Sequence, residues 1–180
     1  SVEIEAAAKL RSLGLSHVEV KTAHALAYRA IVFRHGYKIA ERGYRPQDLA
    51  ALLNLPTLPG ILNGPLILAS HTLRFASLFC NQTPAKVEEL DYPATLADPL
   101  SRSLALSRLE EITYHTRLFL KKMNDGAIPI THDFYLKKYQ LSRPALPYDL
   151  IFFAEAQDAS PAMLDPVLSQ PPDKVIVGHR

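Results

Sequence analysis

The chain has 180 residues, of which 48% are hydrophobic and 21% are charged, and its formal net charge is +2. A chain of this length fits one domain that buries about two thirds of its unfolded surface, and the composition excludes wholesale disorder. The single cysteine, Cys80, excludes an intrachain disulfide and a cysteine-rich zinc site. Its apolar neighbours predict a buried, unreactive thiol.

Two helices are predicted before residue 36. The first covers 2–13, with acidic residues near its start, basic residues near its end and Gly14 after it. Ser16 and Glu19 have the spacing of a capping box, which predicts a second helix over 17–35. Because this helix is apolar on most of its circumference, we expect it in the middle of a bundle.

The following segment is predicted to continue helically and then to loop. We expect a kink at Gly36, further helix over 37–42, and a short helix that opens at Pro46. Residues 56–65 contain three prolines and two glycines, which predicts an irregular loop.

Two longer helices complete the expected core. The helix over 66–81 is apolar almost all round, and the helix over 101–123 has one apolar face because its residues recur at steps of three and four. That face contains Ala105, Leu109, Ile112, Thr116, Phe119 and Met123. We expect these two helices to pack with the helix over 17–35.

The last part of the chain is expected to be segmented. Thr131 or Asp133 starts a predicted helix that ends near Leu141, and six prolines fall between residues 144 and 172. Residues 151–153 fit a helix or a strand, and 174–177 fit a short strand or a tail. The predicted architecture is all-α: one helical-bundle-like domain of six or seven helices over 1–143, followed by a proline-punctuated C-terminal arm over 144–180. The arm packs on the domain or on a neighbouring copy.

Charge alternates along the chain. Residues 1–45 and 99–143 each hold eight Lys or Arg against four Asp or Glu, so each block carries +4. Residues 46–98 and 144–180 each hold two against five, so each carries −3. Two basic helical blocks that alternate with acidic ones indicate surfaces for a partner.

The basic blocks contain candidate contacts for nucleic acid. Four cations of the first block recur at steps of four, four and three, so they share one face of a helix that continues past Gly36. Cations displace counterions from phosphates, and aromatic rings stack on unpaired bases. The candidates are Arg34, Lys38, Arg42 and Arg45 with Tyr37 and Tyr44, and, in the second block, Arg117, Lys121, Lys137 and Lys138.

The arm contains candidate assembly residues, because apolar side chains lie on a net acidic segment. These residues either fold back on their own domain or cross to a neighbouring copy, where the −3 arm meets a +4 block. They are Ile151, Phe152, Phe153, Leu164 and Val167.

No catalytic motif is recognisable. The sequence lacks GxSxG, a P-loop and GxGxxG, so we expect no enzyme, no catalytic residue and no cofactor. Glu111 and His115 share a helix face but lack the HExxH spacing, so they are interpreted as a surface pair and no metal is expected.

These patterns favour a non-enzymatic binding and assembly protein, a scaffold or structural component, that works through helix faces and the arm. The alternative is a coat- or nucleoprotein-like protein that binds single-stranded nucleic acid (RNA) along the helical Lys/Arg–Tyr series. The expected partner is a second copy or another protein, with nucleic acid as the alternative. No membrane is expected, because no apolar run reaches about 18 residues without a charge. The cytoplasm or nucleus is the expected location, and Ser1 in place of an initiator methionine suggests a fragment or a processed chain.

Overall fold

The computed structural model describes residues 2–178, which form a mostly helical structure with one small sheet. Within these residues, no helix is both long enough and apolar enough to cross a membrane. The α-helices are α1 (Val2–Ser12), α2 (Ala23–Ala27), α3 (Pro46–Leu53), α4 (Gly64–Asn81), α5 (Pro99–Ser107), α6 (Leu109–Asn124), α7 (His132–Leu141) and α8 (Pro161–Leu168). A π-helical segment, η1 (Tyr28–Phe33), continues α2, and the 3-10 turns are η2 (Val87–Glu89), η3 (Pro93–Thr95) and η4 (Ala156–Asp158). The strands are β1 (Leu150–Phe153) and β2 (Asp173–Ile176).

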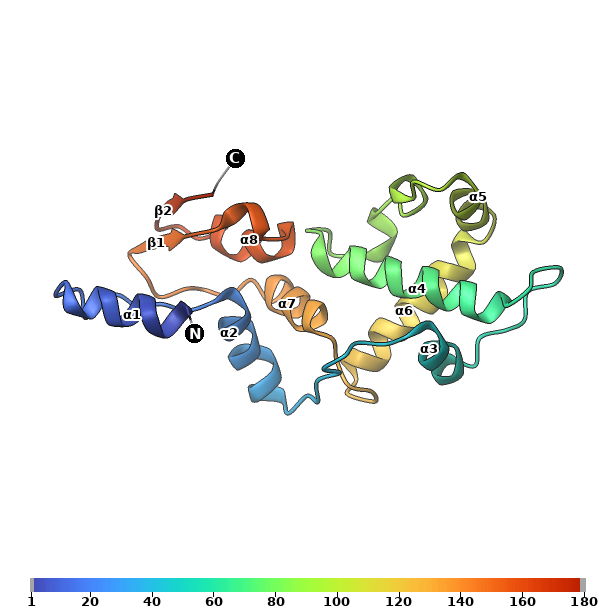
Figure 1. The fold of residues 1–180 in the computed structure, drawn as a ribbon, viewed down its shortest axis with the longest axis horizontal. Coiled ribbons are helices and arrows are strands. Elements are labelled where there is room, and N and C mark those ends of the chain that lie inside the picture. The colour runs from blue at the N-terminus through green and yellow to red at the C-terminus, as the bar shows by residue number, and fades with distance from the viewer. Residues whose placement is uncertain (1, 179–180) are drawn as a thin grey trace.

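Helix α4 is the centre of the fold. It packs against α3, α6, α7 and α8, and Figure 1 shows α3, α5 and α6 toward one end of the molecule and α2, α7 and α8 toward the other. Leu68, Phe75 and Phe79 of α4 are buried by these neighbours. Neighbours on several sides explain why the helix is apolar almost all round, and the predicted helix over 66–81 is confirmed.

The predicted helix over 101–123 is wrong in one respect, because it is two helices. Arg108 leaves the helical region, with φ −124° and ψ 22°, and separates α5 from α6. Helix α5 packs on η3, where the Arg102 guanidinium donates to the carbonyl of Leu96 at 2.6 and 3.0 Å. This contact holds α5 in a direction of its own (Figure 1). The predicted face survives on α6, where Ile112, Thr116, Phe119 and Met123 are buried.

The predicted helix over 17–35 begins later than expected, because residues 17–22 are not helical. The Thr22 hydroxyl accepts a hydrogen bond of 3.0 Å from the backbone N–H of Ala25 and caps α2. Glu19, the expected capping-box partner, instead pairs with Lys21 and accepts a hydrogen bond from the Tyr148 hydroxyl. The side chain that local spacing assigns to a cap is therefore used in a contact with the distant arm.

The C-terminal arm corrects the all-α prediction. Strands β1 and β2 pair in parallel, with Phe152 opposite Val175, and α8 lies between them in the chain. Helix α8 packs on α7 and α4 of the same chain and buries Ala162 and Val167. The chain is therefore a helical structure with a small parallel sheet in its arm.

Candidate nucleic-acid interface

The first basic series does not lie on a helix. The helix ends before Gly36, whose φ is +68°, and residues 37–45, termed the basic loop, are extended or turning. Ile39 forms a parallel bridge with Ile130, and backbone hydrogen bonds of 2.8 and 2.9 Å flank it. The predicted helical continuation over 37–42 is therefore wrong. A left-handed glycine followed by strand-like pairing ends the helix.

The two tyrosines of the series fasten this loop to the body. The Tyr37 hydroxyl donates to the carbonyl of Asn124 at 2.7 Å, and the Tyr44 hydroxyl donates to the carbonyl of Pro129 at 2.6 Å. The Tyr44 ring also meets the Phe119 ring edge-on, with centroids 5.2 Å apart, and burial raises the pKa of Tyr44. Both rings therefore serve to hold the loop, which removes them as free stacking platforms.

Three cations of the series remain available to a partner. Arg34, Lys38 and Arg42 are exposed, and none of them makes an ion pair with another residue of the described range 2–178. Arg45 differs, because its Nε lies 2.9 Å from Oδ2 of Asp48. Lys38 and Arg42 of the basic loop, together with Arg34 at the end of the preceding helix, are termed the loop cations.

A hollow of about 300 Å³ lies beside the basic loop. Its rim carries Asp133, whose Oδ2 accepts hydrogen bonds of 3.1 Å from the Ser77 hydroxyl and the Asn81 amide. An apolar floor with a few polar rim groups is the usual make-up of a small-ligand site. The hollow is lined by Ala40, Gly43 and Tyr44 of the loop, Leu73, Ala76, Ser77 and Cys80 of α4, Phe119 and Met123 of α6, and Thr131, His132 and Asp133.

Lys137, a predicted contact of the second basic block, is withdrawn from the surface. Its side chain is 1% exposed, and its Nζ donates to the carbonyls of Gln82 and Pro84, both at 2.6 Å. The same nitrogen lies 4.6 Å from the centre of the Phe79 ring. Burial lowers the pKa of Lys137 to about 8. This lysine joins α7 to the segment after α4 and is not part of a basic surface.

The other three candidates of the second block have partners. Arg117 lies 3.1 Å from Glu88, Lys121 pairs with Asp125, and Lys138 donates to Oδ1 of Asn124 at 2.5 Å. These contacts reduce what the second block offers to a polyanion, since exposed pairs already screen part of its charge.

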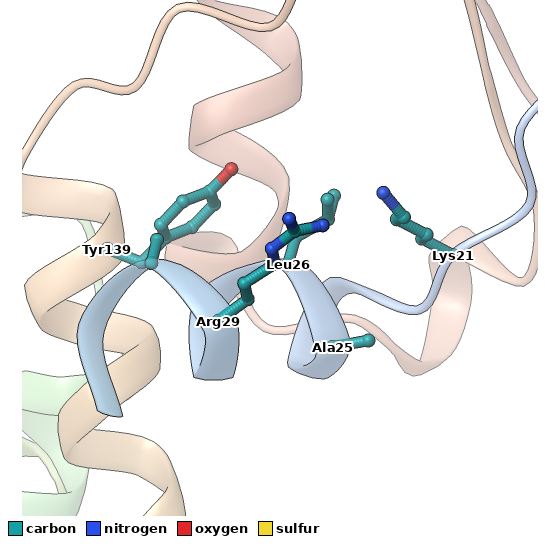
Figure 2. A pocket seen from close by; sticks show the side chains of 6 residues that line it. Lys21, Ala25, Leu26, Arg29 and Tyr139 are labelled. Atoms are coloured by element: carbon teal, nitrogen blue, oxygen red, sulfur yellow. The ribbon is translucent and has the colours of Figure 1, made fainter. Parts of the chain in front are cut away.

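A second hollow, of about 510 Å³, opens between the α2–η1 segment and α7. Lys21, Arg29 and Tyr139 line it together with Ala25, Leu26 and Ala30, and Figure 2 shows the polar ends of Lys21, Arg29 and Tyr139 above Ala25 in that view. Sequence reasoning missed this group because Tyr139 comes from a distant helix. The available signal was the presence of two cations eight residues apart at the start of a helix.

Two histidines share one tyrosine hydroxyl near both hollows. Nδ1 of His24 lies 2.8 Å from the Tyr135 hydroxyl, and Nδ1 of His132 lies 3.2 Å from it. Nε2 of His132 lies 3.8 Å from Glu41 of the basic loop. Desolvation, and then the neighbouring His132, lower the pKa of His24. The hydrogen bonds link α2 to α7, and the approach of His132 to Glu41 brings the basic loop beside them.

The predicted assembly residues divide between buried and exposed positions. Val167 of α8 is buried, and Ile151, Phe153 and Leu164 are half-buried. Phe152 is 65% exposed. The arm thus uses most of its apolar residues within its own chain and leaves one side of β1 uncovered.

Among residues 2–178, the candidate ligands Glu111 and His115 and the thiol of Cys80 do not belong to a metal-binding group of three or more residues. No group of three or more His, Cys, Asp or Glu in this range could hold a metal ion. Glu111 lies 3.4 Å from Arg108, while His115 is buried with its Nδ1 unpaired. Cys80 is buried, and burial raises the pKa of its thiol.

The comparisons with known proteins identify a partial relative. The chain is 56% identical over 101 residues to F-box DNA helicase 1 of Gallus gallus. The match covers 53% of this chain and 10% of the helicase, so the chain spans about a tenth of the length of this curated relative. No family model matches the chain, and no solved structure matches it.

Proposed function

We propose that this chain binds single-stranded DNA through the basic loop. The observation that carries the proposal is the set of loop cations, which are exposed and have no acidic partner among residues 2–178, while Ala40, Gly43 and Tyr44 of the basic loop line a mostly apolar hollow. Cations of this kind contact backbone phosphates and release counterions. An unstacked base fits a hollow of about 300 Å³, and duplex bases are not available for such insertion.

The partial relative supports DNA as the nucleic acid, because that protein is named a DNA helicase. The 180 residues contain no GxxxxGK[ST] sequence, the phosphate-binding loop of P-loop NTPases. The proposal for this chain is therefore limited to DNA binding. A DNA ligand favours the nucleus among the intracellular locations.

The test is fluorescence polarisation with a labelled oligo-dT at several salt concentrations. Single-strand binding loses affinity with a slope of about −0.7 per phosphate contact on a log–log plot. Replacing all three loop cations by alanine should flatten that slope by about 2. At about 0.1 M salt this change corresponds to roughly 100-fold weaker binding.

The matched control is the triple variant Lys9→Ala, Arg74→Ala, Lys86→Ala, which removes three exposed cations outside the loop. It should keep the wild-type slope to within about 0.7, one contact. Equal losses in both variants would show a diffuse charge effect and refute the loop as the site. A duplex that binds as tightly as oligo-dT would refute insertion of an unpaired base.

A second candidate function is assembly, favoured by the uncovered side of the arm's sheet. Leu150, Phe152 and Val175 lie on one side of it because side chains alternate along each strand and Phe152 is opposite Val175. They are 59%, 65% and 41% exposed. Parallel strands are normally covered on both faces, so a second copy is the proposed cover.

Light scattering over a concentration series tests this assembly. The variant Phe152→Lys should reduce the self-associated fraction without lowering the melting temperature, because the side chain supports no internal packing. A wild-type chain that stays monomeric at the highest concentration would remove this candidate.

A further inference from the structure

The hollow between the α2–η1 segment and α7 is lined by other residues than the hollow beside the basic loop, and three of its lining side chains are polar. In the view of Figure 2 the Arg29 guanidinium lies between the Tyr139 hydroxyl and the Lys21 amine, and all three side chains line the hollow. Guanidinium, ammonium and phenol groups are all hydrogen-bond donors. These three donors come from two separate parts of the chain, residues 21–29 and helix α7, and they line the same hollow.

Arg29 supplies a charge that the protein itself does not pair. It is exposed and makes no hydrogen bond or ion pair with another residue of the described range 2–178. Its electrostatic influence reaches Glu19, whose pKa is lowered first by Lys21, then by Tyr148, and also by Arg29. The fork of a guanidinium matches two oxygens of a phosphate at once, which distinguishes it from a point charge.

The positive charge of Lys21 is partly neutralised, and this determines the net charge around the hollow. Lys21 pairs with Glu19, and the Glu19 carboxylate also accepts a hydrogen bond from Tyr148. The carboxylate is exposed at the rim, so two cations and one acid leave a net charge of about +1 around the hollow. A phosphate diester carries one negative charge and matches it.

Tyr139 gives the site a neutral donor. Its side chain is buried, and no hydrogen bond of its hydroxyl is found among residues 2–178. Burial raises the pKa of Tyr139, so the hydroxyl keeps its proton at neutral pH. Its partner in a complex is therefore an acceptor oxygen.

The floor of the hollow is shaped by small residues on an unusual backbone. Ala25 and Ala30 line it with Leu26, and η1 is a π-helix, a form that is rare and often found at functional sites. Alanine side chains leave the volume of about 510 Å³ unfilled. An apolar floor below three donors suits a phosphate joined to a sugar.

We propose that Arg29, Tyr139 and Lys21 form a phosphate-binding site that takes a backbone phosphate of single-stranded DNA. The proposal deepens the function proposed above, on which the DNA source of the phosphate rests. The phosphate chemistry itself depends only on the three donors. A free phosphate ion is the other source of the same chemistry, and the two arms of the experiment distinguish them.

The first arm uses inorganic phosphate and the intact chain labelled with ¹⁵N. The site predicts saturable shifts of the Arg29 side-chain Nε–H signal and of backbone signals in α2 and η1. The variant Arg29→Gln should weaken this binding at least tenfold, while Arg74→Gln, an exposed arginine on α4, leaves it unchanged. Equal shifts in both variants, or shifts spread over all basic residues, overturn the site.

The second arm uses oligo-dT and the variants Arg29→Gln and Tyr139→Phe. The site predicts a salt slope flatter by about 0.7 for Arg29→Gln, one phosphate contact, and an affinity loss without a slope change for Tyr139→Phe. If phosphate binds and oligo-dT does not bind, the function proposed above fails and the site holds a free phosphate. If oligo-dT binds through the loop cations and neither variant changes it, the site is overturned while the proposed function stands.

Discussion

The buried amine of Lys137 makes stability depend on pH between the lysine's lowered pKa in the folded protein and its ordinary pKa. The ordinary pKa of a lysine is 10.5, and burial lowers the pKa of Lys137 in the folded protein to about 8. Between these values the unfolded chain holds more protons than the native chain. The free energy of unfolding therefore rises with pH in this window and falls as pH drops toward 8.

The size of this effect follows from the two pKa values. Between about pH 7.5 and pH 9.5 the contribution of Lys137 to the free energy of unfolding should rise by about 2 kcal/mol. The neutral amine keeps two N–H donors, which is the number that the carbonyls of Gln82 and Pro84 accept. The folded structure thus loses no hydrogen bond when the proton leaves.

Urea unfolding followed by far-UV circular dichroism at several pH values measures the rise. Lys137→Met keeps an apolar stem and removes the amine, so its pH slope should lack the contribution of Lys137. Its stability should also fall by about 1–3 kcal/mol for each carbonyl left unpaired. Lys138→Met, a change at the half-buried neighbour, is the control and should keep the wild-type slope. Equal slopes in wild type and Lys137→Met would refute the reasoning.

Three further perturbations have defined outcomes. Gly64→Ala should lower stability by about 1–3 kcal/mol in thermal unfolding, because its Cβ would lie 2.7 Å from Cβ of Leu58; an unchanged midpoint would contradict the close approach. Thr22→Ala should cost about 1 kcal/mol through loss of the α2 cap, and Thr22→Ser should restore most of it. Iodoacetamide at about pH 8 should leave Cys80 unmodified in the native protein and alkylate it in urea, because burial raises the thiol pKa and blocks access; rapid native alkylation would contradict this.

Local sequence patterns were sufficient to predict a helix when a single apolar face of that helix packs into the core. The face of α6 was predicted because Ile112, Thr116, Phe119 and Met123 repeat at helical spacing and stay buried. Helix α7 was predicted to start at Thr131 or Asp133, and it is the Thr131 hydroxyl that accepts a hydrogen bond from the N–H of Phe134. Each of these features depends on residues within a few turns of one another.

Long-range contacts decided the features that the sequence did not predict. The break at Arg108 is an exception, because it is local and was missed since the apolar spacing continues across it from Ala105 to Leu109 and Ile112. Lys137 looked like part of a basic surface, yet two carbonyls from a different segment take up its amine. A periodic pattern gives the direction of a side chain on its helix, but the neighbours determine whether that direction leads to solvent.

The candidate site was also predicted in part from the sequence, and the rest of it depends on the tertiary structure. The exposure of Arg34, Lys38 and Arg42 agrees with the cation-rich pattern, while the helix expected to align them ends before Gly36. Tyr37 was expected to stack on a base, and it instead donates to a backbone carbonyl. A tyrosine near cations is compatible with both roles, so only the tertiary structure distinguishes them.

The two proposed contact regions belong to one continuous stretch of chain, because η1 leads from Arg29 directly to Arg34 and the basic loop. A single DNA strand that engages both should show one site per chain. The salt slope of a variant lacking Arg29 and the loop cations together should then flatten by about 2.8, the value for four phosphate contacts on one ligand. If instead two strands bound separately, stoichiometric titration would give two oligonucleotides per chain, and each set of variants would affect only one of them. Continuity of the backbone between the regions favours the single strand, because fixing its first phosphate raises the effective concentration of the next nucleotides at the loop.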